Sequence, residues 1–208
     1  MSTEGRAGYH GPMYVRKDPW YQKAKRDGYR SRAAYKLEQI VAAEKLLKPG
    51  DFVVDAGAAP GGWSQLLARL VGGKGRVLAV DLLRMEALPE GNVTVWLRDL
   101  CDGSLPADVE KELGRKADAV LSDAAPNTTG SAFTDQARSA DLVRTVLAFA
   151  RGVLRPGGTF LAKIFAGPDA DDLFRELQPH FGKVKRVRPE ATRKESSELY
   201  LLARDFRG

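Results

Sequence analysis

The sequence contains very few of the side chains that form disulfides and metal sites. It has one cysteine, Cys101, and two histidines, His10 and His180, in 208 residues. A disulfide framework and a thiolate or imidazole metal cluster are therefore excluded, and we expect no metal centre. The sequence also lacks an apolar run near the ~20 residues that cross a bilayer, and an apolar N-terminal stretch typical of secretory signals. We therefore expect a cytoplasmic protein without membrane contact.

The length and composition are typical of one folded domain. Of the 208 residues, 43% are hydrophobic, which is enough to fill a single core. No internal repeat, low-complexity tract or linker divides the chain. The first residues are rich in glycine, tyrosine and charge, a composition that does not build a core. We expect a flexible basic segment over residues 1–17 and a single domain over residues 18–208.

Positive charge is concentrated in two regions. The formal net charge is +6, yet residues 1–36 hold nine Lys or Arg against three acids, and residues 183–194 hold six against one. In the first region Trp20, Tyr21 and Tyr29 stand among the cations. Cations attract nucleic-acid phosphates and aromatic rings stack on unpaired bases, so this pattern indicates an RNA partner. A basic surface that serves only solubility is the alternative interpretation.

Strand-like and helix-like segments alternate along the chain. Apolar runs of strand length occur at 52–55, 76–81, 93–97, 117–122, 159–165, 183–187 and 199–203. Helical patterns occur at 32–46, 63–71, 135–154 and 169–180. This alternation predicts an α/β fold with a seven-stranded, mostly parallel sheet and helices on both faces. The last two strand runs are joined by a loop without a helical pattern, so we expect the last strand to be antiparallel.

The most informative segment is FVVDAGAAPGGWS at residues 52–64. An apolar strand opens here into a turn whose Gly57, Gly61 and Gly62 let the main chain approach a ligand closely. A nucleotide-type cofactor would lie at this turn, beyond the carboxyl end of the strand. The glycine spacing differs from the Gly-x-Gly-x-x-Gly of dinucleotide sites, and Pro60 removes an amide donor, which disfavours a nucleotide-dependent oxidoreductase. A purely structural turn is the other interpretation.

Carboxylates stand at the carboxyl ends of four of the predicted strands, as Asp55, Asp81, Asp99 and Asp123. The carboxyl ends of parallel strands share one edge of a sheet, where ligands bind. Asp81 comes 24 residues after Gly57, near the offset at which an acid binds ribose hydroxyls in nucleotide-binding folds. We expect Asp99 to accept a hydrogen bond from an adenine amine. Aspartate is also a common turn and cap residue, so it is the set of four that indicates a cofactor site.

Four motifs in this order are similar to those of one family. They are DAGAAPGGWS (55–64), DLL (81–83), SDAAPN (122–127) and LAKIF (161–165). On these motifs, the chain from Asp18 to Ala203 closely resembles the heat-shock ribosomal RNA large subunit methyltransferases of the FtsJ/RrmJ type. The resemblance implies a Rossmann-like S-adenosylmethionine-dependent methyltransferase fold. It also implies methylation of a ribose 2′-hydroxyl of RNA.

The resemblance further implies the residues of a site. The family's Lys-Asp-Lys-Glu tetrad corresponds by motif to Lys36, Asp123, Lys163 and Glu198. Lys163 is then the candidate base for the ribose hydroxyl, and a lysine inside an otherwise apolar strand is itself unusual. The residues implied for S-adenosylmethionine are Gly57, Gly61, Trp63, Asp81, Asp99 and Asp123. Trp63 has core packing as an alternative role.

The resemblance favours one substrate over others. It implies a uridine of 23S ribosomal RNA in the large ribosomal subunit, methylated by a monomeric enzyme. A tRNA ribose remains the alternative substrate, because related enzymes methylate anticodon loops. A non-catalytic RNA-binding assembly factor is disfavoured by the complete tetrad, since a pure binder has no need of a buried lysine.

Overall fold

The structure, a computed structural model, describes residues 19–193 and 195–208. The expected flexible segment 1–17 lies outside the described residues. The helices are α1 (Pro19–Arg26), α2 (Ala33–Glu44), α3 (Gly62–Val71), α4 (Leu105–Leu113), α5 (Ala132–Val153) and α6 (Pro168–Leu177). The strands are β1 (Phe52–Ala56), β2 (Arg76–Asp81), β3 (Val93–Leu97), β4 (Ala117–Ser122), β5 (Leu154–Phe165), β6 (Phe181–Val187) and β7 (Glu198–Phe206).

The strands form one seven-stranded sheet in the order β3-β2-β1-β4-β5-β7-β6. The pairs from β3 to β5 are parallel, and β7 is antiparallel to both of its neighbours. The predicted α/β fold, including the antiparallel last strand, is confirmed. The strand order reverses between β1 and β4, because the chain moves outward from β1 to β3 and then returns. Loops leaving two strands in opposite directions open a crevice at such a point.

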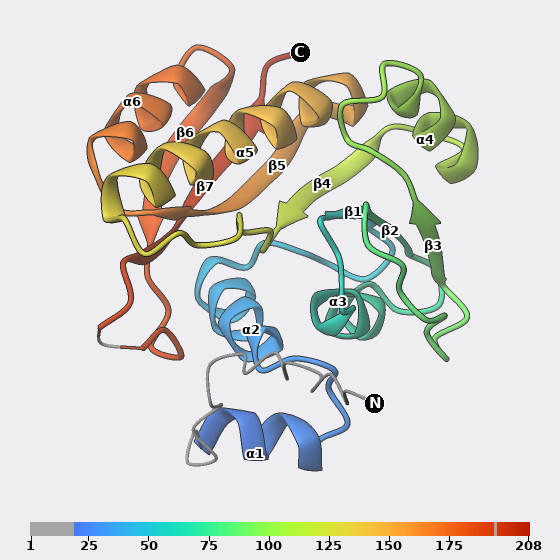
Figure 1. Ribbon diagram of the computed structural model, residues 1–208. Coiled ribbons are helices and arrows are strands. Elements are labelled where there is room, and N and C mark those ends of the chain that lie inside the picture. The colour runs from blue at the N-terminus through green and yellow to red at the C-terminus, as the bar shows by residue number, and fades with distance from the viewer. Residues whose placement is uncertain (1–18, 194) are drawn as a thin grey trace, which may run out of the picture.

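Helices cover both faces of the sheet, and each face has its own core (Figure 1). Alternate strand residues point to opposite faces. Val54 and Val120 pack with α4, α5 and α6 on one face, whereas Val53 and Leu121 pack with α2 and α3 on the other. Tyr200 of β7 belongs to the second core. Side chains of α2 can therefore reach the sheet only on the face that contains Val53, Leu121 and Tyr200.

The sequence did not predict α1, which lies outside α2 in Figure 1. This short helix is held by a small cluster that contains Ala24, Tyr35 and Ala191, with Trp20 and Tyr29 packed against it. The Trp20 and Tyr35 ring centroids are 5.2 Å apart, and the Tyr29 and Tyr35 rings meet edge to face at 5.6 Å. Much of the aromatic surface that was expected to stack on RNA is thus used to dock α1.

Two further differences from the sequence prediction concern α4 and β5. Residues 105–113, predicted as no element, form α4, which buries Leu105, Val109 and Leu113 against the sheet. β5 begins at Leu154, five residues before the predicted start, and its pairing with β4 is irregular near Ala117.

Among the described residues, none of the helices combines the length and the apolar composition that a membrane span requires.

Candidate active site

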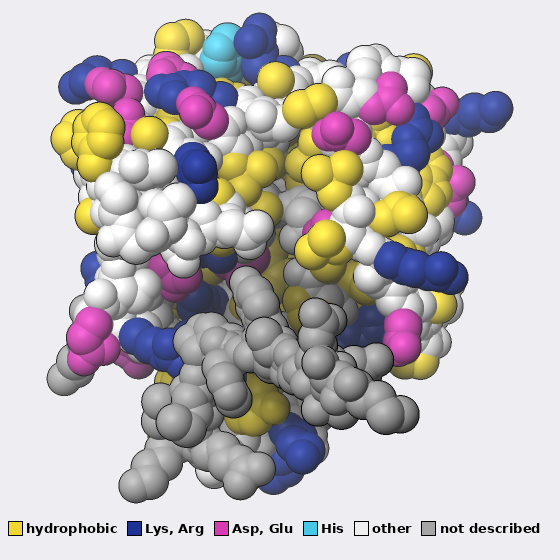
Figure 2. Space-filling model, in the orientation of Figure 1, with side chains coloured by type: hydrophobic (Ala, Val, Ile, Leu, Met, Phe, Trp, Pro, Cys, Tyr) yellow, Lys and Arg dark blue, Asp and Glu magenta, His cyan; other side chains and the backbone are white. Residues whose placement is uncertain are grey.

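A cavity of about 670 Å³ opens at the carboxyl edge of the sheet, where the strand order reverses. Four of the residues predicted for the cofactor line it: Gly57, Asp81, Asp99 and Asp123. Asp81 is the last residue of β2, and the other three come after β1, β3 and β4 in that order. In Figure 2 this face of the molecule is hollowed near its centre, with hydrophobic side chains along the hollow.

The turn after β1 brings two parts of the main chain close together. Gly57 has a φ of +77°, and a Cβ at this position would lie 2.5 Å from the Cβ of Ala124. A larger residue would therefore push the turn away from the segment that follows β4. Gly61 has a φ of +104°, and the space of its missing Cβ is occupied by Met85 and Arg30. Gly61 lies outside the wall of the 670 Å³ cavity.

The carboxylates of Asp81 and Asp99 shape their own loops as well as the cavity wall. Asp81 accepts hydrogen bonds from the amides of Ala59 at 2.8 Å and Leu83 at 2.7 Å. Asp99 accepts one from the amide of Cys101 at 2.8 Å. Each carboxylate has about four lone-pair sites, so acceptor capacity remains for a ligand. Both interpretations of these residues, turn former and ligand acceptor, are thus compatible with one geometry.

Trp63 lies in the core between α3 and α2. Its side chain is 3% exposed, its indole N–H donates to the carbonyl of Ala33 at 2.9 Å, and its ring stacks on Tyr200 with centroids 5.9 Å apart. It also borders a cavity of about 40 Å³ next to Gly57 and Asp123. The geometry therefore favours the packing role of Trp63, with the indole as a support beneath the turn.

Asp55, at the carboxyl end of β1, is a buried carboxyl beside this site. It is 1% exposed; one oxygen accepts a hydrogen bond from the Ser64 hydroxyl at 2.6 Å, and the other has no hydrogen-bond partner within the described residues. Burial raises the pKa of Asp55 to about 7, against the Ser64 hydrogen bond and with the added effect of the charges on Asp123 and Asp81. Asp55 thus ionises near neutral pH.

We expect Asp55→Asn to change how stability depends on pH. The folded state keeps the Asp55 proton up to about pH 7, whereas an unfolded aspartate releases it near pH ~4. The folded state binds more protons in this window, so the wild-type free energy of unfolding should fall by up to ~1.4 kcal/mol per pH unit as pH rises through it. Asp55→Asn, which has no carboxyl to titrate at this position, should lack this fall. Urea unfolding of wild type and variant at several pH values measures the free energy of unfolding of each. Glu110→Gln, at an exposed carboxylate, should keep the wild-type slope.

The two central members of the predicted tetrad are in contact. Lys163 lies in β5 with a side chain 8% exposed, and its Nζ donates to the backbone carbonyl of Asp123 at 2.6 Å. The same nitrogen is 3.2 Å from the Asp123 carboxylate. The Lys163 nitrogen is therefore held against Asp123, directly after β4, and Asp123 lines the 670 Å³ cavity.

The two outer members of the tetrad form a second ion pair. Lys36 Nζ lies 2.6 Å from Glu198 Oε2, with side chains 6% and 21% exposed. Leu37 and Ile40 anchor α2 in the core, which directs Lys36 toward β7. Burial alone would raise the pKa of Glu198, but the hydrogen bond and charge of Lys36, aided by Lys163, lower it below its usual value. Glu198 is therefore a carboxylate at neutral pH.

The sheet register brings the two ion pairs to one place. Lys163 pairs with Tyr200 across β5 and β7, and Phe165 pairs with Glu198. Opposite residues share a face, and so do residues two apart in a strand. Lys163 and Glu198 are thus diagonal neighbours on the face that α2 covers.

Tyr200 is a member of this site that the sequence reading did not single out. Its hydroxyl donates to the Asp123 carboxylate at 2.8 Å. Burial and the neighbouring Asp123 charge raise the pKa of Tyr200 well above its usual value, so it remains a donor at any working pH. Its position two residues after Glu198 on an alternating strand was the available signal. Tyr200 fixes the carboxylate that faces Lys163.

Comparison with known proteins identifies the family. The family model described as FtsJ-like methyltransferase matches residues 29–206, which include every residue of the tetrad. The chain belongs to the FtsJ-like methyltransferase family. It is therefore a methyltransferase, as its motifs predicted.

Relatives of this methyltransferase include two curated proteins named ribosomal RNA large subunit methyltransferase E. One, from Rhodopseudomonas palustris, is 54% identical over 92% of the chain and 81% of its own length. The other, from Methanothermobacter thermautotrophicus, is 45% identical over 93% of the chain and 92% of its own length. A Plasmodium falciparum protein, whose crystal structure was solved as that of a ribosomal RNA methyltransferase, superposes with a TM-score of 0.77. It is 29% identical and covers 86% of this chain and all of its own.

Proposed function

We propose that the protein transfers a methyl group from S-adenosylmethionine to a ribose 2′-hydroxyl of RNA. The observation that carries this proposal is the contact of Lys163 with Asp123, which lines the cavity, together with the Lys36–Glu198 pair on the same face of the sheet. The named activity of the relatives supports ribosomal RNA of the large subunit as the substrate. By resemblance to the family, the acceptor is a uridine of 23S ribosomal RNA.

The cavity fits S-adenosylmethionine by size and by chemistry. Its volume of about 670 Å³ is in the range of small-molecule and cofactor sites, ~300–1,000 Å³. Asp81 would bind the ribose hydroxyls and Asp99 the adenine amine, since both carboxylates line the wall. Gly57 allows the close approach that a bound cofactor needs. When bound, S-adenosylmethionine supplies an electrophilic methyl group on a positively charged sulfur.

The chain's own residues would position and activate the acceptor. A ribose hydroxyl is a weak nucleophile at neutral pH, and loss of its proton during attack speeds the reaction. Lys163 is our candidate for the group that takes this proton. Asp123 holds the Lys163 nitrogen at 2.6 Å through its carbonyl, and Tyr200 holds the Asp123 carboxylate. Lys36 and Glu198 would orient the hydroxyl, because alignment alone contributes much of the rate.

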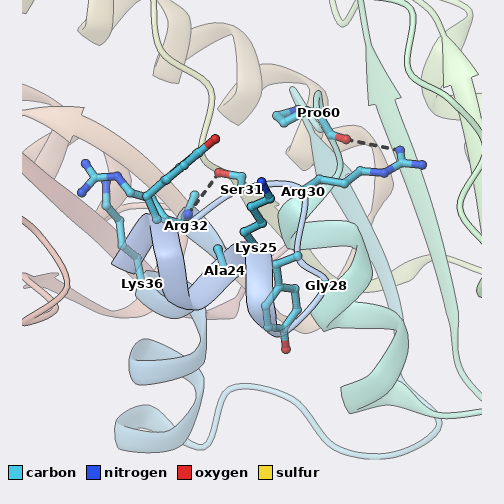
Figure 3. Close-up of a pocket in the computed structure, with 11 residues that line it drawn as sticks. Ala24, Lys25, Gly28, Arg30, Ser31, Arg32, Lys36 and Pro60 are labelled. Carbon is cyan, nitrogen blue, oxygen red and sulfur yellow. Dashed lines mark hydrogen bonds between the residues drawn. The ribbon is translucent and has the colours of Figure 1, made fainter. Parts of the chain in front are cut away.

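A second cavity, of about 570 Å³, is lined by Lys36 of the tetrad and by other positively charged side chains of the kind that RNA phosphates attract. Among the residues that line it are Tyr21, Lys25, Arg32 and Lys36. Figure 3 shows Lys36 and Arg32 on one side of this cavity and Arg30 extending away on the other. A strand of RNA lying here would present its ribose to Lys36, which belongs both to this cavity and to the tetrad.

We expect Lys25→Gln combined with Arg26→Gln to weaken RNA binding and its dependence on salt. Both residues are exposed at the end of α1, whereas Lys23 is held over the Tyr35 ring at 4.1 Å. Loss of two phosphate contacts should reduce the slope of log K against log salt by ~1.4–1.8. Filter binding of a 23S RNA fragment over a salt series measures the slope. The control Lys74→Gln with Lys111→Gln removes two exposed charges elsewhere, and an equal change in both doubles would place the RNA surface away from α1.

The proposed function is tested by transfer of labelled methyl from S-adenosylmethionine to RNA. The acceptors are purified large subunits, free ribosomal RNA and total tRNA from a strain that lacks this protein, with the product nucleotide identified by mass spectrometry. We expect 2′-O-methyluridine in the large subunits. Label in tRNA would retain the chemistry and change the substrate. Cofactor binding without label in any acceptor would contradict the proposed reaction on these RNAs.

A further inference from the structure

Arg30 joins the segment between α1 and α2 to two loops at the cofactor cavity. Its Nη1 donates to the carbonyls of Pro60 at 3.3 Å and Glu86 at 2.8 Å, and its Nη2 donates to the carbonyl of Ala87 at 2.8 Å. Figure 3 shows the bond to Pro60 and the guanidinium pointing away from Lys25 and Lys36. The guanidinium thus bonds to protein backbone on both loops.

Hydrogen bonds also hold the backbone of Arg30 and of the nearby Gly28 in place. The amide of Arg30 donates to Gln65 Oε1 at 2.8 Å, and Gln65 Nε2 donates to the carbonyl of Gly28 at 3.1 Å. Gln65 is buried in α3, one turn after the glycine turn. The backbone from which the Arg30 side chain extends is therefore attached to α3, the helix that follows the glycine turn.

The segment that Arg30 holds carries part of the cavity wall. Residues 82–92, between β2 and β3, form no helix or strand. Leu82 and Leu83 line the 670 Å³ cavity and are 67% and 68% exposed. Two exposed leucines have little packing of their own to hold them, so their position depends on the loop backbone.

Met85 provides a second contact between the same loop and the turn. The Cβ that Gly61 lacks would lie 2.8 Å from Met85 Sδ and 3.3 Å from Arg30 Nη1. Glycine at position 61 thus leaves the space in which Met85 and Arg30 rest on the turn. This explains why Gly61 matters to the site without lining its cavity.

We propose that Arg30 is a positioning residue for the cofactor, which it serves by fixing loop 82–92 to the 58–61 turn. The role rests on the proposed function, since the cofactor is S-adenosylmethionine. A planar guanidinium donates to several acceptors in fixed directions, whereas an ammonium on a flexible stem does not. Arg30→Lys therefore keeps the positive charge that attracts RNA phosphates, and it loses the simultaneous hydrogen bonds to three backbone carbonyls.

The test measures S-adenosylmethionine binding to the purified protein by calorimetry in the absence of RNA. We expect Arg30→Lys to raise the Kd by about tenfold, the loss of one or two charge-assisted hydrogen bonds. In methyl transfer the KM for S-adenosylmethionine should rise by a similar factor, with kcat at saturating cofactor within about threefold of wild type. The salt slope of RNA binding should not change, because the charge is retained.

Two further variants make the result specific. Arg84→Lys, the same substitution at an exposed arginine of the same loop, should leave the Kd unchanged. Met85→Ala loosens the loop by an independent route and should weaken S-adenosylmethionine binding several-fold with kcat preserved. Thermal unfolding of each variant confirms that it is folded.

The outcomes separate this role from the proposed function. Unchanged cofactor affinity in folded Arg30→Lys and Met85→Ala would overturn the positioning role. Weakened RNA affinity with unchanged cofactor affinity would make Arg30 an RNA contact instead. A wild-type protein that does not bind S-adenosylmethionine would overturn the proposed cofactor, and the positioning role with it.

Discussion

Lys163→Met is expected to reduce methyl transfer by at least about a thousandfold while leaving S-adenosylmethionine binding intact. Proton transfer by a positioned group contributes ~10²–10⁴-fold, and removal of the Lys163 nitrogen also removes the partner that holds Asp123. Methionine retains the unbranched stem of lysine, so the buried position in β5 stays filled. Single-turnover rates with saturating RNA and cofactor measure the loss at the chemical step.

Cofactor binding is the readout that separates catalysis from folding in this variant. The proposed cofactor contacts of Asp81 and Asp99 lie on β2 and the loop after β3, and Asp123 keeps its hydrogen bond from Tyr200 when Lys163 is replaced. The Kd should therefore stay within about threefold. Lys74→Met, at an exposed lysine between α3 and β2, should retain full activity. Turnover of Lys163→Met within about tenfold of wild type would exclude Lys163 as the base.

The pH dependence of the rate gives an independent check on Lys163. If its nitrogen takes the hydroxyl proton, the residual activity of Lys163→Met should lose the rising limb of the wild-type pH–rate profile. If the limb persists in the variant, the titrating group is another one. Asp55 is the neighbouring candidate, because burial raises its pKa to about 7.

The sequence predicted the fold well because the signals were local. The strand periodicity, the glycine turn and the aspartates after four strands are all readable within short segments, and they led to the correct sheet and to the cavity edge. The antiparallel β7 also followed from a local feature, the short connection from β6. Helix α1 was missed because eight residues give a weak pattern, and its stability comes from the distant Ala191 and from Tyr35.

The remaining details depended on contacts between distant segments. Arg30 belongs to the basic region over residues 1–36 from which RNA binding was predicted, because a sequence shows its charge and not its three carbonyl acceptors. The sequence left both cofactor binding and core packing open for Trp63, and the fold shows its contacts with Ala33 and Tyr200. The pairing of Lys36 with Glu198 joins residues 162 positions apart. The family motif indicated these two residues, and only the fold shows that they bind each other.

Lys36→Met is expected to lower both activity and stability, and a double variant separates the two effects. Removal of the ammonium leaves the half-buried Glu198 carboxylate without its 2.6 Å partner, which should cost about 1–3 kcal/mol of stability. Loss of one donor at the reacting hydroxyl should also reduce kcat by about 10²–10³-fold. Urea unfolding and single-turnover transfer measure the two quantities on the same preparation.

Adding Glu198→Gln to Lys36→Met removes the uncompensated charge. Stability should return to within about 1 kcal/mol of wild type, because a neutral amide is cheaper to bury than an unpaired carboxylate. Activity should stay low, because the missing ammonium is not replaced and the Glu198 carboxylate, which we propose also orients the hydroxyl, is removed with it. If activity returned with stability, neither the Lys36 ammonium nor the Glu198 carboxylate would be needed for the reaction. If neither returned, the loss would come from α2 itself, whose anchors Leu37 and Ile40 flank the lysine in the core.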